Sequence, residues 1–103
     1  MTLDIESIRD DFPILERRLP NGKQLVYFDN AATSQKPQCV IDAMSEYYSE
    51  YNSNAHRANH TLADEATTAL EDARESISSY FGTSPDQLIF TSGSTVGIIF
   101  VSY

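Results

Sequence analysis

The candidates for chemistry begin with a cluster of imidazole, guanidinium and amide side chains, namely Asn54, His56, Arg57 and His60. His56 and His60 are four residues apart, a spacing that would bring both onto one helix face and within reach of a zinc ion. The segment offers no third ligand such as cysteine at metal-ligand spacing, and its composition indicates a loop. We therefore predict no metal site. Hydrogen bonds to neighbouring backbone are an equally good interpretation of these side chains.

A second candidate is the run TSGST at residues 91–95, which lies between apolar runs at residues 88–90 and 96–101. A strand that passes through glycine and hydroxyls into a helix N-terminus is suited to hold a phosphate. Backbone N–H groups and the helix dipole favour an anion there, and serine and threonine hydroxyls add donors without bulk. The same letters are also ordinary loop chemistry, so both interpretations stand.

A third candidate is YFDNAATSQKP at residues 27–37, whose residue types do not serve a hydrophobic core. Asp29 and Asn30 tolerate turn geometry and bond their own backbone. The two alanines, Ala31 and Ala32, are too small to fill space and leave room for another group to approach. We expect a strand, a polar turn and a helix start, with an ordinary strand-to-helix loop as the alternative.

Two long helices are expected to position these segments. Apolar and aromatic residues recur at helical spacing over residues 40–51, and the short polar residues 52–54 end that pattern. A second stripe runs over residues 63–81, with Thr61 as the expected N-cap and Gly82 as the terminator. The alanine-rich first half of this stripe permits close approach of another element.

Shorter elements are expected around these helices. Residues 3–12 predict a short amphipathic helix, and residues 20–23 contain the Asn-Gly pair typical of a tight turn. We expect strands at residues 24–28 and 88–90 and the opening of another helix at residues 96–101.

Composition excludes several classes of protein. Over 103 residues the hydrophobic content is 41% and the charged content 21%, values typical of a soluble globular chain. A net charge of −8 argues against nucleic acid and anionic membrane surfaces as partners. No window approaches a membrane span, and the single Cys39 cannot form an internal disulfide, so we expect a cytoplasmic protein. No linker long enough to separate a second domain is present.

Three ordered motifs, at residues 28–37, 54–62 and 89–95, resemble the SufS-like cysteine desulfurases of the class V aminotransferase family. The resemblance implies the N-terminal part of a pyridoxal-phosphate-dependent fold type I domain over residues 1–103, with no second domain. Such a domain is α/β, and this part of it would be mostly helical with short strands. A complete relative converts L-cysteine to alanine and passes the sulfur on, as a persulfide, for iron–sulfur cluster assembly. A homodimer or a sulfur-acceptor protein partner is implied as well.

The resemblance also assigns roles to the candidate residues. Ser94 and Thr95 would contact the phosphate of pyridoxal phosphate. The chain departs from the family pattern directly afterwards, because apolar Val96 and Ile99 replace the usual Glu and Asn. Gly97 in the same run costs roughly 1 kcal/mol of helix stability relative to alanine.

The substrate pocket is implied to comprise Ala31, Ala32, His56 and Arg57. By the same resemblance, His56 and Arg57 lie at the mouth of the active site near the subunit interface. There Arg57 would counter a carboxylate and His56 would donate hydrogen bonds.

The reaction also needs a Schiff-base lysine, an acid for the pyridine nitrogen and a nucleophilic cysteine. The two lysines, Lys23 and Lys36, and the single Cys39 do not match the family's catalytic positions. We therefore assign no catalytic residue in these 103 residues and expect no turnover by this polypeptide alone. The alternatives are a non-catalytic protein that binds a full-length desulfurase through its apolar helix stripes, or another class V enzyme such as a selenocysteine lyase.

Overall fold

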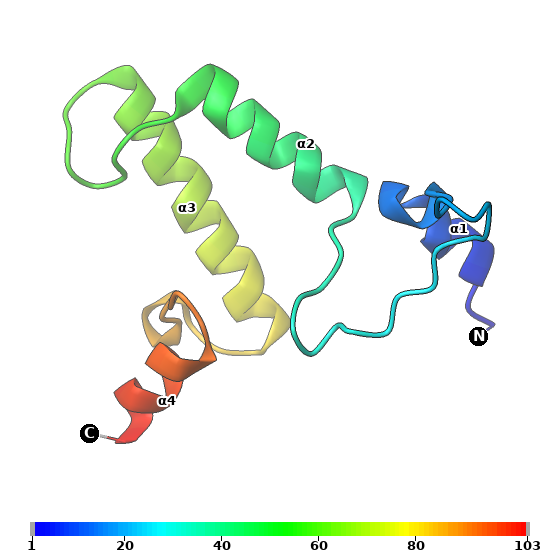
Figure 1. Ribbon diagram of the computed structural model, residues 1–103. Coiled ribbons are helices and arrows are strands. Elements are labelled where there is room, and N and C mark those ends of the chain that lie inside the picture. The colour runs from blue at the N-terminus through cyan, green and yellow to red at the C-terminus, as the bar shows by residue number, and fades with distance from the viewer. Residues whose placement is uncertain (1, 103) are drawn as a thin grey trace. The chain divides into compact units, whose positions relative to one another are not determined.

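Helices make up the regular secondary structure of residues 2–102, the range that the computed structural model describes (Figure 1). Contacts within the chain divide it into two units, Met1–Asn52 and Ser53–Tyr103. The mostly helical character expected from the sequence is confirmed.

The first unit begins with α1 (Ile5–Asp10), which confirms the short helix expected within residues 3–12. The Asp4 carboxylate caps this helix by accepting a hydrogen bond from the Ser7 N–H at 3.2 Å. A proline follows, and because proline lacks an N–H the chain continues only as the short 3-10 helix η1 (Pro13–Glu16).

The two expected strands, at residues 24–28 and 88–90, are absent from the described chain, so that prediction is wrong for this structure. The only pairing among residues 2–102 is an isolated antiparallel bridge between Arg18 and Gln24. It closes the predicted tight turn, in which Gly22 has a φ of +77°. A strand is stable only beside a partner, and neither apolar run finds one within the described residues.

The helix expected over residues 40–51 is confirmed. It consists of α2 (Gln38–Glu46), which continues directly into η2 (Tyr47–Tyr51), a wider π-helical turn. Pro37 stands at the N-cap with φ −68°. Asn52 leaves the helical region with ψ 113°, as the run of short polar residues predicts.

The principal helix of the second unit is α3 (Thr61–Tyr80), which confirms the longest predicted helix. Gly82 has a φ of +67° just beyond its end and acts as the expected terminator. The predicted N-cap, Thr61, is wrong because Thr61 is already helical. His60 is the cap instead, and its side chain accepts a hydrogen bond from the Ala63 N–H at 3.3 Å.

The alanine-rich stripe of α3 is covered in its first half only. Ala63 and Ala66 are buried, at 0% and 5% exposure, so a close neighbour does approach here. Tyr80 and Phe81 at the other end are 85% and 71% exposed. Two short elements complete the second unit, the 3-10 helix η3 (Pro85–Gln87) and α4 (Ser94–Ser102).

Candidate functional site

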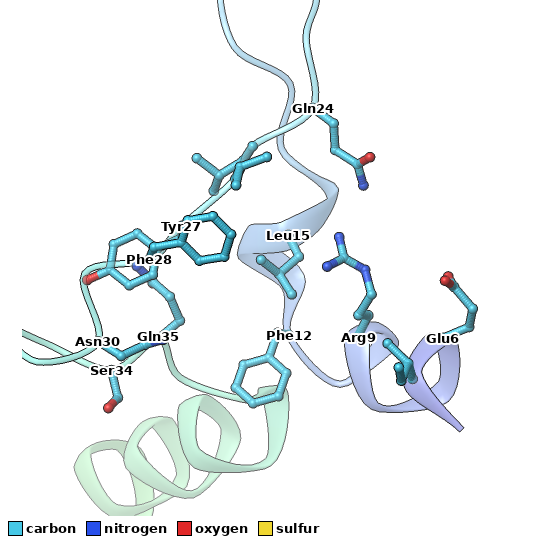
Figure 2. Close-up of a pocket in the computed structure, with 13 residues that line it drawn as sticks. Glu6, Arg9, Phe12, Leu15, Gln24, Tyr27, Phe28, Asn30, Ser34 and Gln35 are labelled. Carbon is cyan, nitrogen blue, oxygen red and sulfur yellow. The ribbon is translucent and has the colours of Figure 1, made fainter. Parts of the chain in front are cut away.

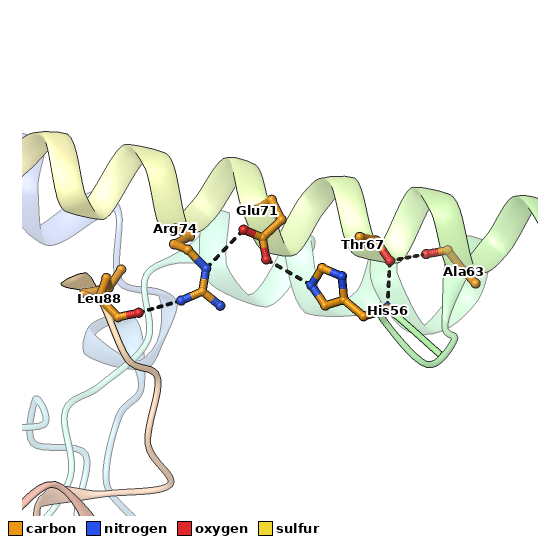
Figure 3. Close-up of polar contacts among 6 residues, drawn as sticks. All are labelled: His56, Ala63, Thr67, Glu71, Arg74 and Leu88. Atoms are coloured by element: carbon orange, nitrogen blue, oxygen red, sulfur yellow. Dashed lines mark hydrogen bonds and ion pairs between the residues drawn. The ribbon is translucent and has the colours of Figure 1, made fainter. Parts of the chain in front are cut away.

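His56 lies in the loop that precedes α3, and two contacts fix it to that helix (Figure 3). Its backbone N–H donates to Thr67 Oγ1 at 2.9 Å, and its imidazole Nε2 lies 3.0 Å from Glu71 Oε1. With a proton on Nε2, the second contact is a hydrogen bond to the carboxylate. His56 also has a φ of +61°, a left-handed conformation that is uncommon for residues other than glycine.

Arg74 extends this network along α3. Its Nε donates to Glu71 Oε2 at 3.1 Å, and its Nη1 donates to the Leu88 carbonyl oxygen at 2.6 Å. The guanidinium also lies over the Phe90 ring, 4.9 Å from the ring centroid. One arginine therefore connects α3 to the chain segment that leads toward α4.

The electrostatics of the network centre on Glu71. A hydrogen bond from His56 lowers the pKa of the Glu71 carboxyl below its ordinary value of 4.5, because that bond favours the carboxylate. Partial desolvation opposes the shift, and the charge and hydrogen bond of Arg74 reinforce it. The docked loop therefore favours the carboxylate form of Glu71.

Arg57, the next residue after His56, is exposed. The structure gives it no hydrogen bond or ion pair with any residue between 2 and 102, so its guanidinium is free to meet an external anion. The histidine of the predicted pair is thus held by the protein, and the arginine is presented to solvent.

Ser94 and Thr95 form the first turn of α4, as the phosphate-site prediction requires. Both are exposed, and the described chain supplies no hydrogen-bond partner for either hydroxyl. The first backbone bond of the helix runs from the Gly97 N–H to the Gly93 carbonyl at 3.1 Å. The N–H groups of residues 94–96 precede that bond and point out of the helix end, as the donors of a phosphate site would.

Ala31 and Ala32 lie in a turn that the neighbouring tyrosine holds in place. The Tyr27 hydroxyl lies 2.9 Å from the carbonyl oxygen of Asp29 and 2.6 Å from that of Thr33, and its proton can be donated to one of them at a time. The Ala32 N–H in turn donates to the Asp29 carbonyl at 3.1 Å. Both alanines are exposed, which agrees with the room that their size was expected to leave.

A cleft of about 830 Å³ lies within the first unit beside this turn (Figure 2). Asn30 and Ser34, which flank the alanines, line it together with apolar side chains such as Phe12, Leu15 and Tyr27. Figure 2 shows these side chains gathered around the cleft. Ala31 and Ala32 are not among its lining residues, so the cleft is not the predicted substrate pocket.

The predicted site residues are divided between the two units. His56, Arg57 and the pair at the start of α4 belong to Ser53–Tyr103, whereas the two alanines belong to Met1–Asn52. Each group is locally well formed: the first unit presents the turn, and the second presents the histidine, the arginine and the helix end.

Sequence reasoning missed the residues that hold these groups. Thr67, Glu71 and Arg74 sit at helical spacing of four and three, which places them on one face of α3. That spacing was a readable signal of a polar face, but nothing in the sequence pairs it with His56 or Leu88. The strand predicted over residues 24–28 includes Tyr27 and gives no indication that its hydroxyl donates to the turn.

Residues 2–102 contain neither a metal-binding cluster nor a membrane-spanning helix. No group of three or more His, Cys, Asp or Glu side chains lies close enough together to hold a metal ion. No helix in this range is long and apolar enough to cross a membrane.

Comparison with known families decides the affiliation of the chain. The family model described as "Aminotransferase class-V" matches residues 26–103. The chain belongs to the class V aminotransferase family. The resemblance noted from the three motifs is thereby confirmed at the level of the family, and the matched residues 26–103 include α2, α3 and α4.

Individual class V relatives carry a narrower name. The chain is 50% identical over 101 residues to a "Probable cysteine desulfurase" of Streptomyces coelicolor, covering 97% of this chain and 24% of that protein. It is 50% identical over 100 residues to a "Cysteine desulfurase" of Synechococcus elongatus, covering 96% and 16%. A solved structure, the apo cysteine desulfurase of Thermococcus onnurineus NA1, matches with a TM-score of 0.71 and 35% identity. That match covers 88% of this chain and 21% of the solved one.

The chain therefore spans about a quarter or less of the length of these relatives. The similarity to cysteine desulfurases extends over nearly all of the present sequence, and it includes the loop of His56, helix α3 and the start of α4.

Proposed function

We propose that this chain supplies the N-terminal part of a pyridoxal-phosphate-dependent cysteine desulfurase. The observation that carries the proposal is the start of α4, where residues 94–96 present N–H groups. Ser94 and Thr95 present exposed hydroxyls there that have no hydrogen-bond partner among residues 2–102. These donors fit a phosphate group. Relatives that are 50% identical over almost the whole chain and are named cysteine desulfurases support the choice within the family.

Bound pyridoxal phosphate supplies the electron sink that weakens bonds at the α-carbon of an amino acid. The residues of this chain would hold the cofactor and orient the amino-acid substrate. Ser94 and Thr95 bind the phosphate through hydroxyls and backbone N–H groups. Arg57 pairs with the substrate carboxylate, Glu71 holds His56 beside it, and Ala31 and Ala32 leave space for the amino acid.

L-Cysteine is the proposed substrate, with alanine as product and the sulfur passed on for iron–sulfur cluster assembly. A cytoplasmic homodimer that delivers sulfur to an acceptor protein is the corresponding proposal for assembly and location. Cys39, which is free and exposed, is compatible with a reducing compartment. The lysine, the acid and the nucleophilic cysteine of the reaction are not assigned to any residue of this chain.

Phosphate binding tests the cofactor half of the proposal. The 103-residue chain is titrated with pyridoxamine phosphate, which lacks the aldehyde that would react with Lys23 or Lys36. We expect the amide resonances of Ser94 and Thr95 to shift, and a double Ser94→Ala, Thr95→Ala variant to bind about tenfold more weakly. Ser102→Ala, at the far end of α4, is the matched control. Equal affinity of the double variant and the control would refute the phosphate site.

Turnover tests the assignment of catalysis. We expect no cysteine-dependent alanine production by the purified 103-residue chain. The control is a heat-denatured sample of the same protein, and alanine formed above that background would show that the chain carries a catalytic centre of its own.

Exposed apolar surface favours a second candidate, a non-catalytic protein that binds a full-length desulfurase. Phe100 and Val101 on α4 are 62% and 88% exposed. Co-purification of such an enzyme with the tagged chain would support this alternative, and failure to bind at micromolar concentration would count against it. A selenocysteine lyase is a third candidate, distinguished by the product released from selenocysteine and from cysteine.

A further inference from the structure

Helix α3 carries a short polar strip on one face, made of Thr67, Glu71 and Arg74. The strip contacts the loop before the helix at His56 and the segment after it at Leu88 (Figure 3). The two segments are otherwise far apart in the sequence.

The N-terminal part of the strip, formed by Thr67 and Glu71, fixes the backbone of His56 as well as its side chain. Thr67 Oγ1 donates its proton to the Ala63 carbonyl at 2.7 Å, which leaves its lone pairs to accept the His56 N–H at 2.9 Å. Glu71 holds the imidazole at 3.0 Å. A non-glycine residue at φ +61° is costly, and it persists where surrounding contacts stabilise it as they do here.

The C-terminal part of the strip, formed by Arg74, fixes the chain segment that follows α3. Arg74 donates to the Leu88 carbonyl at 2.6 Å and covers the Phe90 ring. The segment held in this way runs directly into residues 91–95 and the start of α4. Since Glu71 binds both His56 and Arg74, the two halves of the strip share one carboxylate.

We propose that Thr67, Glu71 and Arg74 are positioning residues that hold the substrate-binding loop and the phosphate-binding segment on one helix. The inference rests on the proposed function for the roles of the two segments. Thr67 and Glu71 turn His56 toward α3 and leave Arg57 facing solvent, and Arg74 sets the path of the chain into the phosphate site. None of the three touches substrate or cofactor in this arrangement.

Amide hydrogen exchange of the chain, measured without any cofactor, tests the contact between Thr67 and His56. A Thr67→Val variant keeps the shape of the side chain and removes the acceptor, whereas Thr67→Ser retains the hydroxyl. We expect exchange at the His56 amide to rise about fivefold in the valine variant and to stay close to wild type in the serine variant. Amides in the middle of α3 should be unchanged in both, which separates a local release from general destabilisation.

Equal exchange at His56 in wild type and Thr67→Val would overturn this part of the proposal. If the valine variant does not fold, the wild-type protein decides the matter. An unprotected His56 amide in the wild type contradicts the contact, and a protected one together with the serine result supports it.

NMR relaxation tests the contacts of Arg74 with residues 88–90. We expect Arg74→Ala to lower the backbone order parameters of residues 88–90, and Glu65→Gln, an exposed change on the same helix, to leave them unaltered. The Arg74→Ala variant should also bind pyridoxamine phosphate about threefold more weakly, the loss expected for a hydrogen bond of under 1 kcal/mol. Looser residues 88–90 with unchanged affinity would overturn the link to the phosphate site.

These measurements separate the two proposals. If the chain binds no phosphate at Ser94 and Thr95 but exchange and relaxation respond as expected, the proposed function fails and the positioning contacts remain. If phosphate binds and the strip variants change nothing, the positioning proposal fails by itself.

Discussion

At the scale of the residue, the two histidines of this chain are both committed to α3. His60 caps the helix, and His56 is hydrogen-bonded to Glu71 near its middle. Within residues 2–102, neither belongs to a group of three or more His, Cys, Asp or Glu side chains that could hold a metal ion. The residue that stays available is Arg57, so anion recognition in this loop depends on a guanidinium beside a histidine whose orientation the helix determines.

Acid should release His56 from α3. The pKa of Glu71 is lowered in the folded chain, so its contribution to stability is fully present above the unfolded value near 4.5 and is lost as pH falls through the folded pKa. The side chains that face Glu71 are His56 from the loop and Arg74 from α3. We therefore expect Glu71→Gln to be less stable than wild type at neutral pH and equally stable in strong acid.

Urea unfolding of both proteins across this pH range measures the difference. Glu65→Gln serves as the matched control, because Glu65 is an exposed carboxylate on the same helix and its replacement should leave the pH dependence unchanged. A stability difference between wild type and Glu71→Gln that persists below the folded pKa would contradict the linkage.

The Tyr27 hydroxyl gives a second prediction at this scale. Tyr27→Phe removes the donor to the Asp29 and Thr33 carbonyls, and we expect a loss of up to about 1 kcal/mol in the local stability of the turn. Faster exchange at the Ala32 amide, which bonds within that turn, is the readout. Unaltered exchange at Ala32 would show that the turn holds without the tyrosine.

At the scale of the element, the sequence predicted those structures whose stabilising contacts are local. α2 and α3 follow from apolar residues at helical spacing, and the ends at Asn52 and Gly82 follow from turn chemistry. The strand prediction at residues 24–28 failed because a short run of consecutive apolar residues still needs a partner strand. The cap of α3 was misassigned because threonine is a commoner cap than histidine.

The candidate site divides in the same way. The hydroxyls at the start of α4 could be located from glycine, serine and a following apolar run, all of which are adjacent in sequence. The contacts of the strip on α3 could not be located from the sequence, because its partners His56 and Leu88 belong to the loops before and after the helix. Only the folded path of those loops brings them to Glu71 and Arg74.

Gly97, inside α4, and Gly82, just beyond α3, provide a contrasting pair of substitutions. A Cβ at Gly97, inside α4, would lie 3.8 Å from Thr91 Oγ1, which is an ordinary contact. We expect Gly97→Ala to stabilise α4 by about 0.5–1 kcal/mol, because alanine loses less backbone entropy than glycine on folding. Helical circular dichroism during urea unfolding would report the gain, and a loss would contradict the helical geometry assigned to this residue.

Gly82→Ala should have the opposite effect and lower the free energy of unfolding. Gly82 has a φ of +67° and open space around it, so the cost comes from the left-handed backbone and not from a clash. We expect a loss of about 1 kcal/mol, and Gly82→Asn should recover part of it since asparagine tolerates this conformation. Equal stability of the alanine variant and wild type would show that α3 does not end in the left-handed residue.

At the scale of the whole molecule, much apolar surface is not covered. Phe28 is 92% exposed in the first unit, and Phe81 and Val101 are 71% and 88% exposed in the second. Surface of this kind marks places where other protein packs. We expect the isolated chain to self-associate at micromolar concentration, as sedimentation velocity would measure, and a sharp monomeric boundary across that range would contradict this expectation.

The tyrosines of η2 give the molecule an optical property of its own. Tyr47 meets the rings of Tyr48 and Tyr51 edge-on, with centroids 5.4 and 5.3 Å apart. The chain contains no tryptophan, so nothing masks tyrosine absorption and emission. Near-ultraviolet dichroism should therefore come largely from the coupled rings of this one helical turn, while far-ultraviolet dichroism follows all the helices. The near-ultraviolet signal would then report the melting of η2, and the far-ultraviolet signal that of all the helices together, without any label.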